Sequence, residues 1–509
     1  MVARSSNRAA IPNSSPTPER RIGAPRGLVW PVLRSTSRPA FLAAILTRPN
    51  SGQEHDMAAD RHGVIDVQEF IDSRRFSPFQ WGILILCFLI VAADGFDTAA
   101  IGFVAPALIK EWSVSKVDLG PVLSAALLGL AVGALVAGPA ADRYGRKRVL
   151  LASVIIFGVL SLLSAYASSL NQLLALRFLT GVGLGAAMPN ATTLLSEYAP
   201  ANRRGFLVNV MFCGFTLGAA GGGFAAATLI PEFGWRSVFI VGGIIPLILA
   251  VALLWLPDSV RYMVVSGKSP AEIRAVLERI GGKGSAMATR FVLPEHDSNQ
   301  EASPLSIVLS PRLRFGTFML WVTYFMGLLV YYLLSSWMPT LIREAGMSIR
   351  DASLVTALFP LGSTVGAIIC GWLMDRLNPF RIVGFAYLST GVFVWAVGQS
   401  LGDTGLLIAL TFTAGLFMGG GQVSMPVLAA SHYPTAGRAS GVAWMLGIGR
   451  FGGILGAFLG GTLFQFGLSL PTILGMLAIP AMIAAVSILA MGAASRKNEA
   501  DYVRSEALS

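Results

Sequence analysis

Twelve stretches of about 20 mostly apolar residues restrict the fold of this chain more than any other feature. A membrane helix needs about 20 such residues, because each adds about 1.5 Å across a hydrocarbon core of about 30 Å. Only 13% of the 509 residues are charged and 54% are hydrophobic, a balance too apolar for a soluble protein. We therefore expect an all-α membrane protein with twelve transmembrane helices. The expected spans are 81–108, 119–140, 149–167, 172–194, 206–230, 235–256, 315–339, 353–373, 383–400, 405–430, 441–464 and 470–491.

Basic residues gather in the loops on one side of these spans. Cytoplasmic loops carry an excess of Lys and Arg, so this side is expected to be cytoplasmic, with both termini inside the cell. The same excess explains the formal net charge of +11 without a nucleic-acid partner. We expect a multi-pass protein of the cell inner membrane, in contact with lipid and monomeric. The residues concerned are Arg143, Arg146, Lys147, Arg148, Arg203, Arg204, Arg376, Arg381 and Arg438.

The chain repeats itself at an interval of about half its length. The stretch from Gly138 to Arg143 returns 233 residues later, and Tyr198-Ala199-Pro200 is echoed 235 residues later. Such a repeat predicts two six-helix bundles that face each other across a central cavity. The domain boundaries that we expect are an N-terminal bundle at 76–256, a cytoplasmic central loop at 257–314 with an amphipathic stretch at 271–280, a C-terminal bundle at 315–492 and a cytoplasmic tail at 493–509.

Residues 1–75 form a cytoplasmic N-terminal segment that we expect to be largely disordered. Its first 56 residues are rich in Arg, Ser and Pro and contain few acids. Two interpretations remain open: a transit-like peptide, which has this composition, or an upstream extension of a start at Met57. The extension is favoured because no signal-peptide pattern leads into the first span.

The loop between the second and third spans carries a strong family signal. Gly138-x-x-x-Asp142-Arg143-Tyr144-Gly145-Arg146-Lys147 resembles the signature loop of the major facilitator superfamily. The resemblance implies the major facilitator fold and a gating role for Asp142, Arg143, Gly145 and Arg146. An acid here can meet the N-terminal dipole of a helix in the same bundle. The second copy keeps Gly371, Asp375 and Arg376 but has Asn378 and Pro379 where Gly and Arg would stand.

The first span narrows the resemblance. The stretch Asp94-Gly95-Phe96-Asp97-Thr98-Ala99-Ala100-Ile101-Gly102-Phe103 resembles the aromatic acid:proton symporter family, as does the stretch from Gly441 to Arg450. The resemblance implies import of a small aromatic carboxylate together with protons. Hydroxybenzoate, protocatechuate, benzoate and vanillate all fit it. In that family Glu197 and Arg438, at the cytoplasmic ends of spans four and ten, would belong to the inner gate.

Four ionisable residues fall inside the expected spans: Asp94, Asp97, Arg177 and Arg450. A charge at the bilayer centre costs at least about 2.5 to 3.5 kcal/mol, so such residues usually line a cavity and are functional. Asp94 and Asp97 lie on one helical face, three residues apart. Asp97 would lie about 16 Å and Arg177 about 10 Å below the outer boundary, so the two can pair.

These residues suggest a mechanism with the proton as coupling ion. Burial and a neighbouring like charge favour the protonated form of one of the acids Asp94 and Asp97. Loss of that charge frees Arg177 or Arg450 for the substrate carboxylate, which guanidinium binds as a planar fork. The alternative is that Asp97 and Arg177 form a structural ion pair. Aromatic residues would supply apolar walls, and Tyr331 and Trp444 are our candidates, although such residues also face lipid.

Other functions have less support. The fifth span resembles the antiporter motif of the superfamily but has Ala219 in place of its proline, which disfavours export by antiport. A transporter of another organic anion or a neutral solute stays open, and so does a non-transporting membrane sensor, although no soluble stretch is long enough for a signalling domain. Enzymatic activity, a metal site and a cofactor are not expected, because the sequence has no nucleotide-binding loop or metal cluster.

Overall fold

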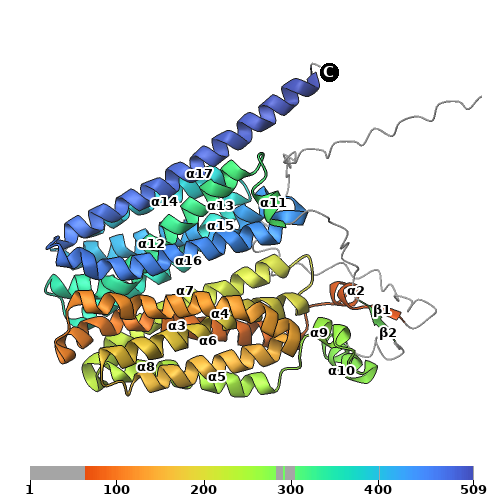
Figure 1. Ribbon diagram of the computed structural model, residues 1–509, viewed down its shortest axis with the longest axis horizontal. Helices are drawn as coiled ribbons and strands as arrows, with labels where there is room; N and C mark the ends of the chain where they lie inside the picture. Colours follow the sequence, from red (N-terminus) through yellow and green to blue (C-terminus); the bar gives the residue numbers. More distant parts are fainter. Residues whose placement is uncertain (1–63, 282–289, 293–303, 401, 508–509) are drawn as a thin grey trace, which may run out of the picture. The chain divides into compact units, whose positions relative to one another are not determined.

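The computed structural model describes residues 64–281, 290–292, 304–400 and 402–507. Within these ranges, twelve helices are long and apolar enough to cross a membrane, which confirms the expected fold class (Figure 1). The first six are α3 (Pro78–Trp112), α4 (Lys116–Tyr144), α5 (Arg146–Ser164), α6 (Leu170–Tyr198), α7 (Arg204–Phe233) and α8 (Arg236–Leu254). The second six are α12 (Arg314–Glu344), α13 (Ile349–Met374), α14 (Pro379–Gln399), α15 (Thr404–His432), α16 (Thr435–Gln465) and α17 (Leu470–Ala507).

Most helices extend a few residues beyond the expected spans, because their ends are capped by polar side chains that hydropathy excludes. Ser77 and Gln80 form a capping box at the start of α3, and the Ser115 hydroxyl accepts a bond from an amide in the first turn of α4. The twelfth helix, α17, departs most from expectation, since it ends at Ala507 rather than near residue 491. The eleventh helix, α16, begins at Thr435 rather than near residue 441. Arg438 therefore lies in the first turn of span eleven, not at the end of span ten.

Short elements join the bundles at one end. They are β1 (Val64–Asp66), α2 (Val67–Asp72), α9 (Val260–Val265), α10 (Pro270–Gly281), β2 (Arg290–Val292) and α11 (Pro304–Val308). Strand β1 pairs in parallel with β2, and α10 covers the amphipathic stretch expected at 271–280. The Asp72 carboxylate accepts a bond from the Ala201 amide at 2.8 Å, which ties α2 to the loop before α7. Residues 64–75 are thus helix, strand and turn within the segment that was expected to be largely disordered; residues 1–63 lie outside the described residues.

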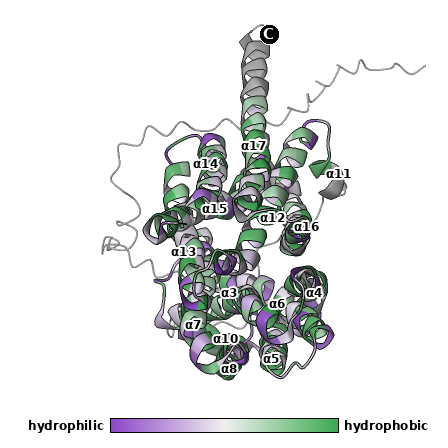
Figure 2. Ribbon diagram, turned by 90° about the vertical axis from the view of Figure 1, so that its left-hand side faces the viewer, coloured by the Kyte–Doolittle hydropathy of each residue, from purple (hydrophilic) through white to green (hydrophobic). Residues whose placement is uncertain are grey.

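Glycine allows the helices inside each bundle to pack backbone to backbone. A Cβ atom at Gly95 of α3 would overlap the Phe215 carbonyl of α7, and one at Gly181 of α6 would overlap the Ala126 carbonyl of α4. Gly366 of α13 has the same relation to α15 in the second bundle. Small residues at interfaces are the usual means by which membrane helices associate, because lipid removes the hydrophobic driving force between them. Many large hydrophobic side chains remain exposed on these helices, and Figure 2 colours much of the helical ribbon as hydrophobic.

The two bundles meet closely at one end, which we call the sealed end. There a Cβ at Gly102 would lie 2.7 Å from the Ser335 carbonyl, and one at Gly120 would lie 2.8 Å from the Phe458 carbonyl. An ion pair also joins the bundles: Lys116 Nζ lies 2.8 Å from Glu344 Oε2. The same ammonium lies 4.4 Å from the ring centroid of Phe464, a cation–π distance. The seal therefore combines backbone contact with an interbundle charge pair.

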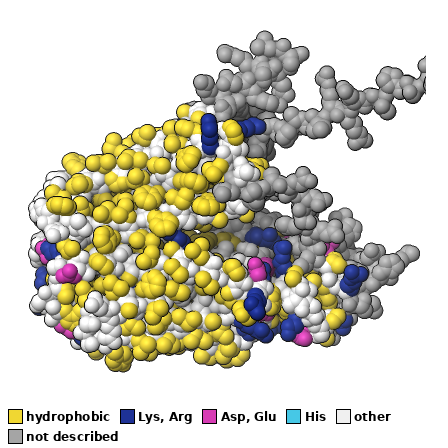
Figure 3. Space-filling view, in the orientation of Figure 1, with side chains coloured by type: hydrophobic (Ala, Val, Ile, Leu, Met, Phe, Trp, Pro, Cys, Tyr) yellow, Lys and Arg dark blue, Asp and Glu magenta, His cyan; other side chains and the backbone are white. Residues whose placement is uncertain are grey.

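The opposite end, which we call the basic end, carries Arg146, Lys147 and Arg204. Figure 3 shows a recess between the two bundles at this end, with Lys and Arg side chains beside it. Several glycines toward this end touch no neighbour: Gly138 of α4, Gly371 of α13 and Gly447 of α16 have no atom within 4 Å of an added Cβ. The bundles are thus in contact at the sealed end and parted at the basic end.

The charge pair of the sealed end can be tested by reversal. Glu344→Lys places two cations together, so we expect the seal to open and a cysteine introduced at buried Ser336 to react faster with a maleimide. The exchange Lys116→Glu with Glu344→Lys should return the labelling rate toward that of the parent, because it restores the pair. Protein without the introduced cysteine corrects for Cys87, Cys213 and Cys370. Equal labelling rates in the single and exchanged variants would contradict a role of this ion pair in closing the sealed end.

Candidate functional site

A fully buried ion pair lies inside the N-terminal bundle. Arg177 Nη1 is 3.0 Å from Asp97 Oδ2, and neither side chain has any exposed surface. The Ser161 hydroxyl donates to Asp97, while Arg177 Nη2 donates to Ser164 at 2.8 Å and to Thr180 at 3.2 Å. Helices α3, α5 and α6 thereby share one polar cluster.

The guanidinium of Arg177 also lies 4.6 Å from the ring centroid of Phe239 in α8. Sealed between four helices, it does not reach a solvent-accessible surface in this conformation. The expected pairing of Asp97 with Arg177 is present. A direct substrate contact by Arg177, which we also expected, would require this cluster to open.

Asp94 has a different environment from Asp97. Its side chain is 1% exposed and accepts one hydrogen bond, from the Thr98 hydroxyl at 3.2 Å. The second carboxylate oxygen is buried without a hydrogen-bond partner among the described residues. Asp94 interacts electrostatically with Asp97 and with Arg450 of the other bundle. A buried carboxylate that is incompletely hydrogen-bonded is costly when ionised, so Asp94 is the acid of the pair that gains more from a proton.

Arg450 bridges the two bundles from the middle of α16. It lies on α16 and donates from Nη1 to the Leu130 carbonyl of α4 at 2.8 Å. A guanidinium has five N–H donors, and this is the hydrogen bond that Arg450 makes within the described part of the chain. The side chain is only partly buried. Donors of Arg450 thus remain for a ligand between the bundles.

The two expected aromatic residues lie in different surroundings. Tyr331 is 7% exposed and packs against Phe359, with ring centroids 5.6 Å apart. Its hydroxyl is buried without a partner among the described residues. Trp444 is 46% exposed and lies 6.2 Å from the Trp321 ring. Neither is among the side chains found to interact electrostatically with Arg450, which are Tyr324, Tyr332 and Asp94.

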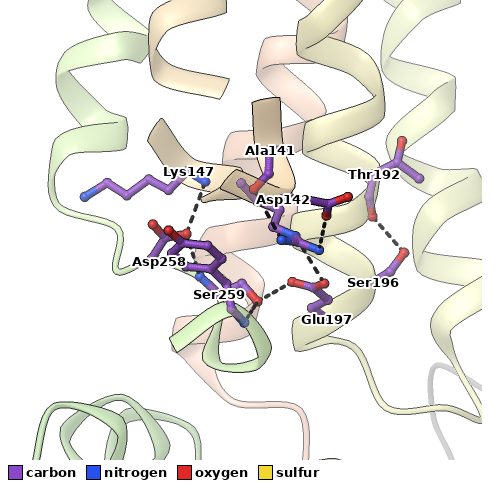
Figure 4. Close-up of polar contacts among 10 residues, drawn as sticks. Ala141, Asp142, Lys147, Thr192, Ser196, Glu197, Asp258 and Ser259 are labelled. Carbon is purple, nitrogen blue, oxygen red and sulfur yellow. Dashed lines mark hydrogen bonds and ion pairs between the residues drawn. The ribbon is translucent and has the colours of Figure 1, made fainter. Parts of the chain in front are cut away.

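A network of polar contacts closes the basic end of the N-terminal bundle (Figure 4). Arg146 joins two acids: its Nη2 lies 3.0 Å from Asp142 Oδ1 and its Nε lies 3.5 Å from Glu197 Oε1. The Ser259 hydroxyl donates to Glu197 on its other side. The network therefore connects the α4–α5 loop, the end of α6 and the segment after α8. Asp142 and Arg146 also line a pocket of about 110 Å³ with Pro189, Asn190 and Thr193 of α6.

The acid at the start of α5 is not the one expected. We predicted that Asp142 meets a helix N-terminus, but Asp142 binds Arg146, and Asp258 accepts a bond from the Lys147 amide in the first turn of α5. Gly145 adopts φ 95°, a left-handed backbone that favours glycine, and a Cβ there would lie 2.5 Å from the Asp258 carboxylate. Arg143 contributes its carbonyl, which accepts a bond from the Tyr262 hydroxyl at 3.3 Å.

The second copy of the loop forms no comparable network among the described residues. Asp375 ends α13 and is exposed, and the Arg376 guanidinium stacks 3.8 Å from the Trp372 ring centroid. Asn378, which stands where the motif has glycine, caps α14 by accepting a bond from the Arg381 amide at 3.2 Å. Arg438 is exposed and makes no ion pair with Glu197 in the described structure. The gating residues of the two halves thus differ.

Comparisons with known proteins place the chain in a family. The sequence profile of the Major Facilitator Superfamily matches residues 87–457 and 320–506. The chain belongs to the Major Facilitator Superfamily. It is 53% identical to the 4-hydroxybenzoate transporter PcaK of Pseudomonas aeruginosa over 85% of this chain and 96% of that protein. It is 48% identical to the gallate transporter of Pseudomonas putida over 84% of this chain and 95% of the relative.

Within the superfamily the chain groups with transporters of aromatic acids, as its sequence resemblance indicated. The benzoate transport protein of Acinetobacter baylyi is 33% identical over 83% of this chain and 92% of that protein. Among solved structures, the inward-open xylose transporter XylE of E. coli has a TM-score of 0.64 at 17% identity, and covers 80% of this chain and 95% of its own. This similarity shows the fold alone. The chain is a membrane transporter and not an enzyme.

Sequence reasoning missed several residues of the site. Asp258 and Ser259, which follow the sixth span, were not among the predicted site residues, yet they complete the network at the basic end. Ser161, Ser164 and Thr180 complete the coordination of the buried ion pair, and isolated hydroxyls in apolar spans give no signal of their own.

The role of the buried ion pair can be tested by removing one of its charges and then both. Arg177→Met leaves the Asp97 carboxylate unpaired in an apolar interior, which should cost about 3–5 kcal/mol, whereas Asp97→Asn with Arg177→Met removes both charges. We expect the midpoint of thermal unfolding in detergent to fall most for the single variant and to recover in the double variant. Arg236→Met is the control, because it breaks an exposed pair with Glu111 (2.7 Å) of small worth. If the Arg177 variant is no less stable than the Arg236 variant, the pair is not a structural requirement.

Proposed function

We propose that this chain is a proton-coupled symporter that imports a small aromatic carboxylate of the hydroxybenzoate, protocatechuate or benzoate class by alternating access. The relatives named as 4-hydroxybenzoate, gallate and benzoate transporters support the substrate class. The observation that carries the proposal is the position of Arg450, a partly buried cation between the two bundles that interacts with the incompletely bonded acid Asp94.

The orientation follows from charge. We place the basic end in the cytoplasm, because cytoplasmic loops of inner-membrane proteins carry the excess of Lys and Arg. Both termini then lie inside the cell, and the sealed end faces outward. Contact at the sealed end and the recess at the basic end correspond to an inward-facing conformation. The protein acts as a monomer with the proton as its coupling ion and requires no other cofactor.

Coupling arises from competition for Arg450. When the cavity is open to the outside, Asp94 takes a proton and loses its attraction for the guanidinium, which then binds the substrate carboxylate as a charge-assisted pair. After the bundles rock, Asp94 releases its proton inward and attracts Arg450 again. The substrate anion loses its partner and leaves. Asp97 keeps its ion pair with Arg177 and lies next to Asp94 on the same face of α3.

Uptake of labelled aromatic acids by cells that express the chain tests this function. We expect accumulation of 4-hydroxybenzoate, protocatechuate or benzoate that a protonophore abolishes, and none in cells with an empty vector. Xylose and a neutral aromatic amide serve as controls for the charge requirement. Uptake that survives the protonophore would exclude proton coupling, and uptake of the amide at the same rate would exclude the role of the carboxylate.

Asp94→Asn separates proton coupling from substrate binding. An asparagine imitates the protonated acid permanently, so we expect exchange of external for internal substrate to continue while accumulation against a gradient is lost. Glu232→Gln removes an exposed acid at the end of α7 and should change neither. Accumulation by the Asp94 variant at the parent level would assign the proton to another group.

A further inference from the structure

We propose that Tyr324 and Tyr332 of α12 complete a three-donor site for the substrate carboxylate together with Arg450. The inference rests on the proposed function, since it names further residues of the same site. Both tyrosines are aromatic residues of the seventh span that could wall a substrate site; the substrate-binding residues predicted from the sequence were their neighbour Tyr331 and Trp444.

Glycines of α16 set the positions of both tyrosine rings. Gly449 directly precedes Arg450, and a Cβ atom there would overlap the Tyr324 ring. One turn further on, a Cβ at Gly453 would lie 2.6 Å from Cδ2 of Tyr332. The two rings are therefore seated one turn apart on the same face of α16, next to the turn that carries Arg450. Any larger side chain at either glycine would displace its tyrosine.

Both tyrosines act on Arg450 electrostatically and remain partly exposed. Arg450 interacts with Tyr332, Tyr324 and Asp94, and Tyr332 in turn interacts with Asp94. Neither tyrosine hydroxyl is buried without a partner among the described residues, in contrast to that of Tyr331. Phenol hydroxyls and a guanidinium are all hydrogen-bond donors. Their convergence between the bundles provides a site for an anion with two oxygens.

Tyr324 interacts with a second polar group behind it. This group is Gln422 of α15, whose Oε1 accepts a bond from the Tyr387 hydroxyl at 2.7 Å and whose Nε2 makes no hydrogen bond within the described residues. This pair lies against α12 where Gly327 leaves room: a Cβ there would be 2.7 Å from the Tyr387 hydroxyl. Gln422 is 8% exposed. We regard it as a positioning residue, because it acts on the ligand through Tyr324.

The chemistry of the three donors favours a carboxylate attached to an aromatic ring. Hydrogen bonds to an ionised oxygen are about twice as strong as neutral ones, so the carboxylate gains from each hydroxyl. The flat faces of the same two tyrosines provide apolar surface for the adjoining ring. An amide or an ester has no full charge and loses this gain. The same two tyrosines would thus recognise both the carboxylate and the aromatic ring of the substrate.

Removal of the hydroxyls tests the proposal. Tyr324→Phe and Tyr332→Phe keep the rings, so we expect each to raise the KM for 4-hydroxybenzoate uptake about tenfold with a smaller change in maximal rate. Tyr166→Phe removes an exposed hydroxyl far from the site in sequence and should leave KM unchanged. Gln422→Leu should raise KM in the parent and add nothing in the Tyr324→Phe background. An unchanged KM in both tyrosine variants overturns the inference.

The glycine seats provide an independent test with a matched control. Gly449→Ala forces Tyr324 to move, whereas Gly447→Ala adds a methyl group where no atom lies within 4 Å, two residues away on the same helix. We expect the KM to rise for the former only, with both variants equally monodisperse in detergent. Equal KM values would overturn the seating argument. Failure of the parent to take up any aromatic acid would instead refute the proposed function itself.

Discussion

Charges in hydrocarbon must be paired or face water, and this requirement organises the whole molecule. Asp97 and Arg177 meet it by pairing, with α5 and α6 contributing hydroxyls and α8 a ring. Arg450 meets it differently, since it faces the space between the bundles and bonds to a backbone carbonyl across it. The first arrangement stabilises a bundle, and the second can be exchanged for a ligand. The free-energy cost of a charge in hydrocarbon is thus met in two ways. A permanent partner serves the structural charges, and an exchangeable partner serves Arg450.

Glycine is the second constraint, because it sets how closely two neighbouring helices can approach. Close backbone contact inside each bundle leaves the helices little freedom, so the bundles move as rigid units. At the sealed end glycines let the two bundles touch, whereas Gly138 and Gly371 toward the basic end have no neighbour within 4 Å of an added Cβ. Transport by rocking needs two such ends, of which no more than one is open at a time. The positions of Gly120 and Gly138 on a single helix, α4, show how one helix can serve both ends.

Hydropathy was enough to predict the twelve spans, the internal repeat predicted two bundles, and helical rise predicted the Asp97–Arg177 pair. It could not place Arg438, since the cap and first turn of α16 are too polar to register as membrane helix. Nor could it find Asp258, whose role depends on the chain returning after six spans to the start of α5. Which tyrosine flanks Arg450 depends on the rotation of α12 against α16, and adjacent residues such as Tyr331 and Tyr332 look alike in sequence.

The pairing of β1 with β2 affects how the protein is made. Val64 precedes the first membrane helix and Arg290 follows the sixth, so the strands can join only after the entire first bundle has left the ribosome. Domains generally fold as units during synthesis, from the N-terminus onward. Closure of this two-stranded ribbon would mark completion of the first half before α12 is inserted. The strand pairing thus joins the beginning and the end of one folding unit.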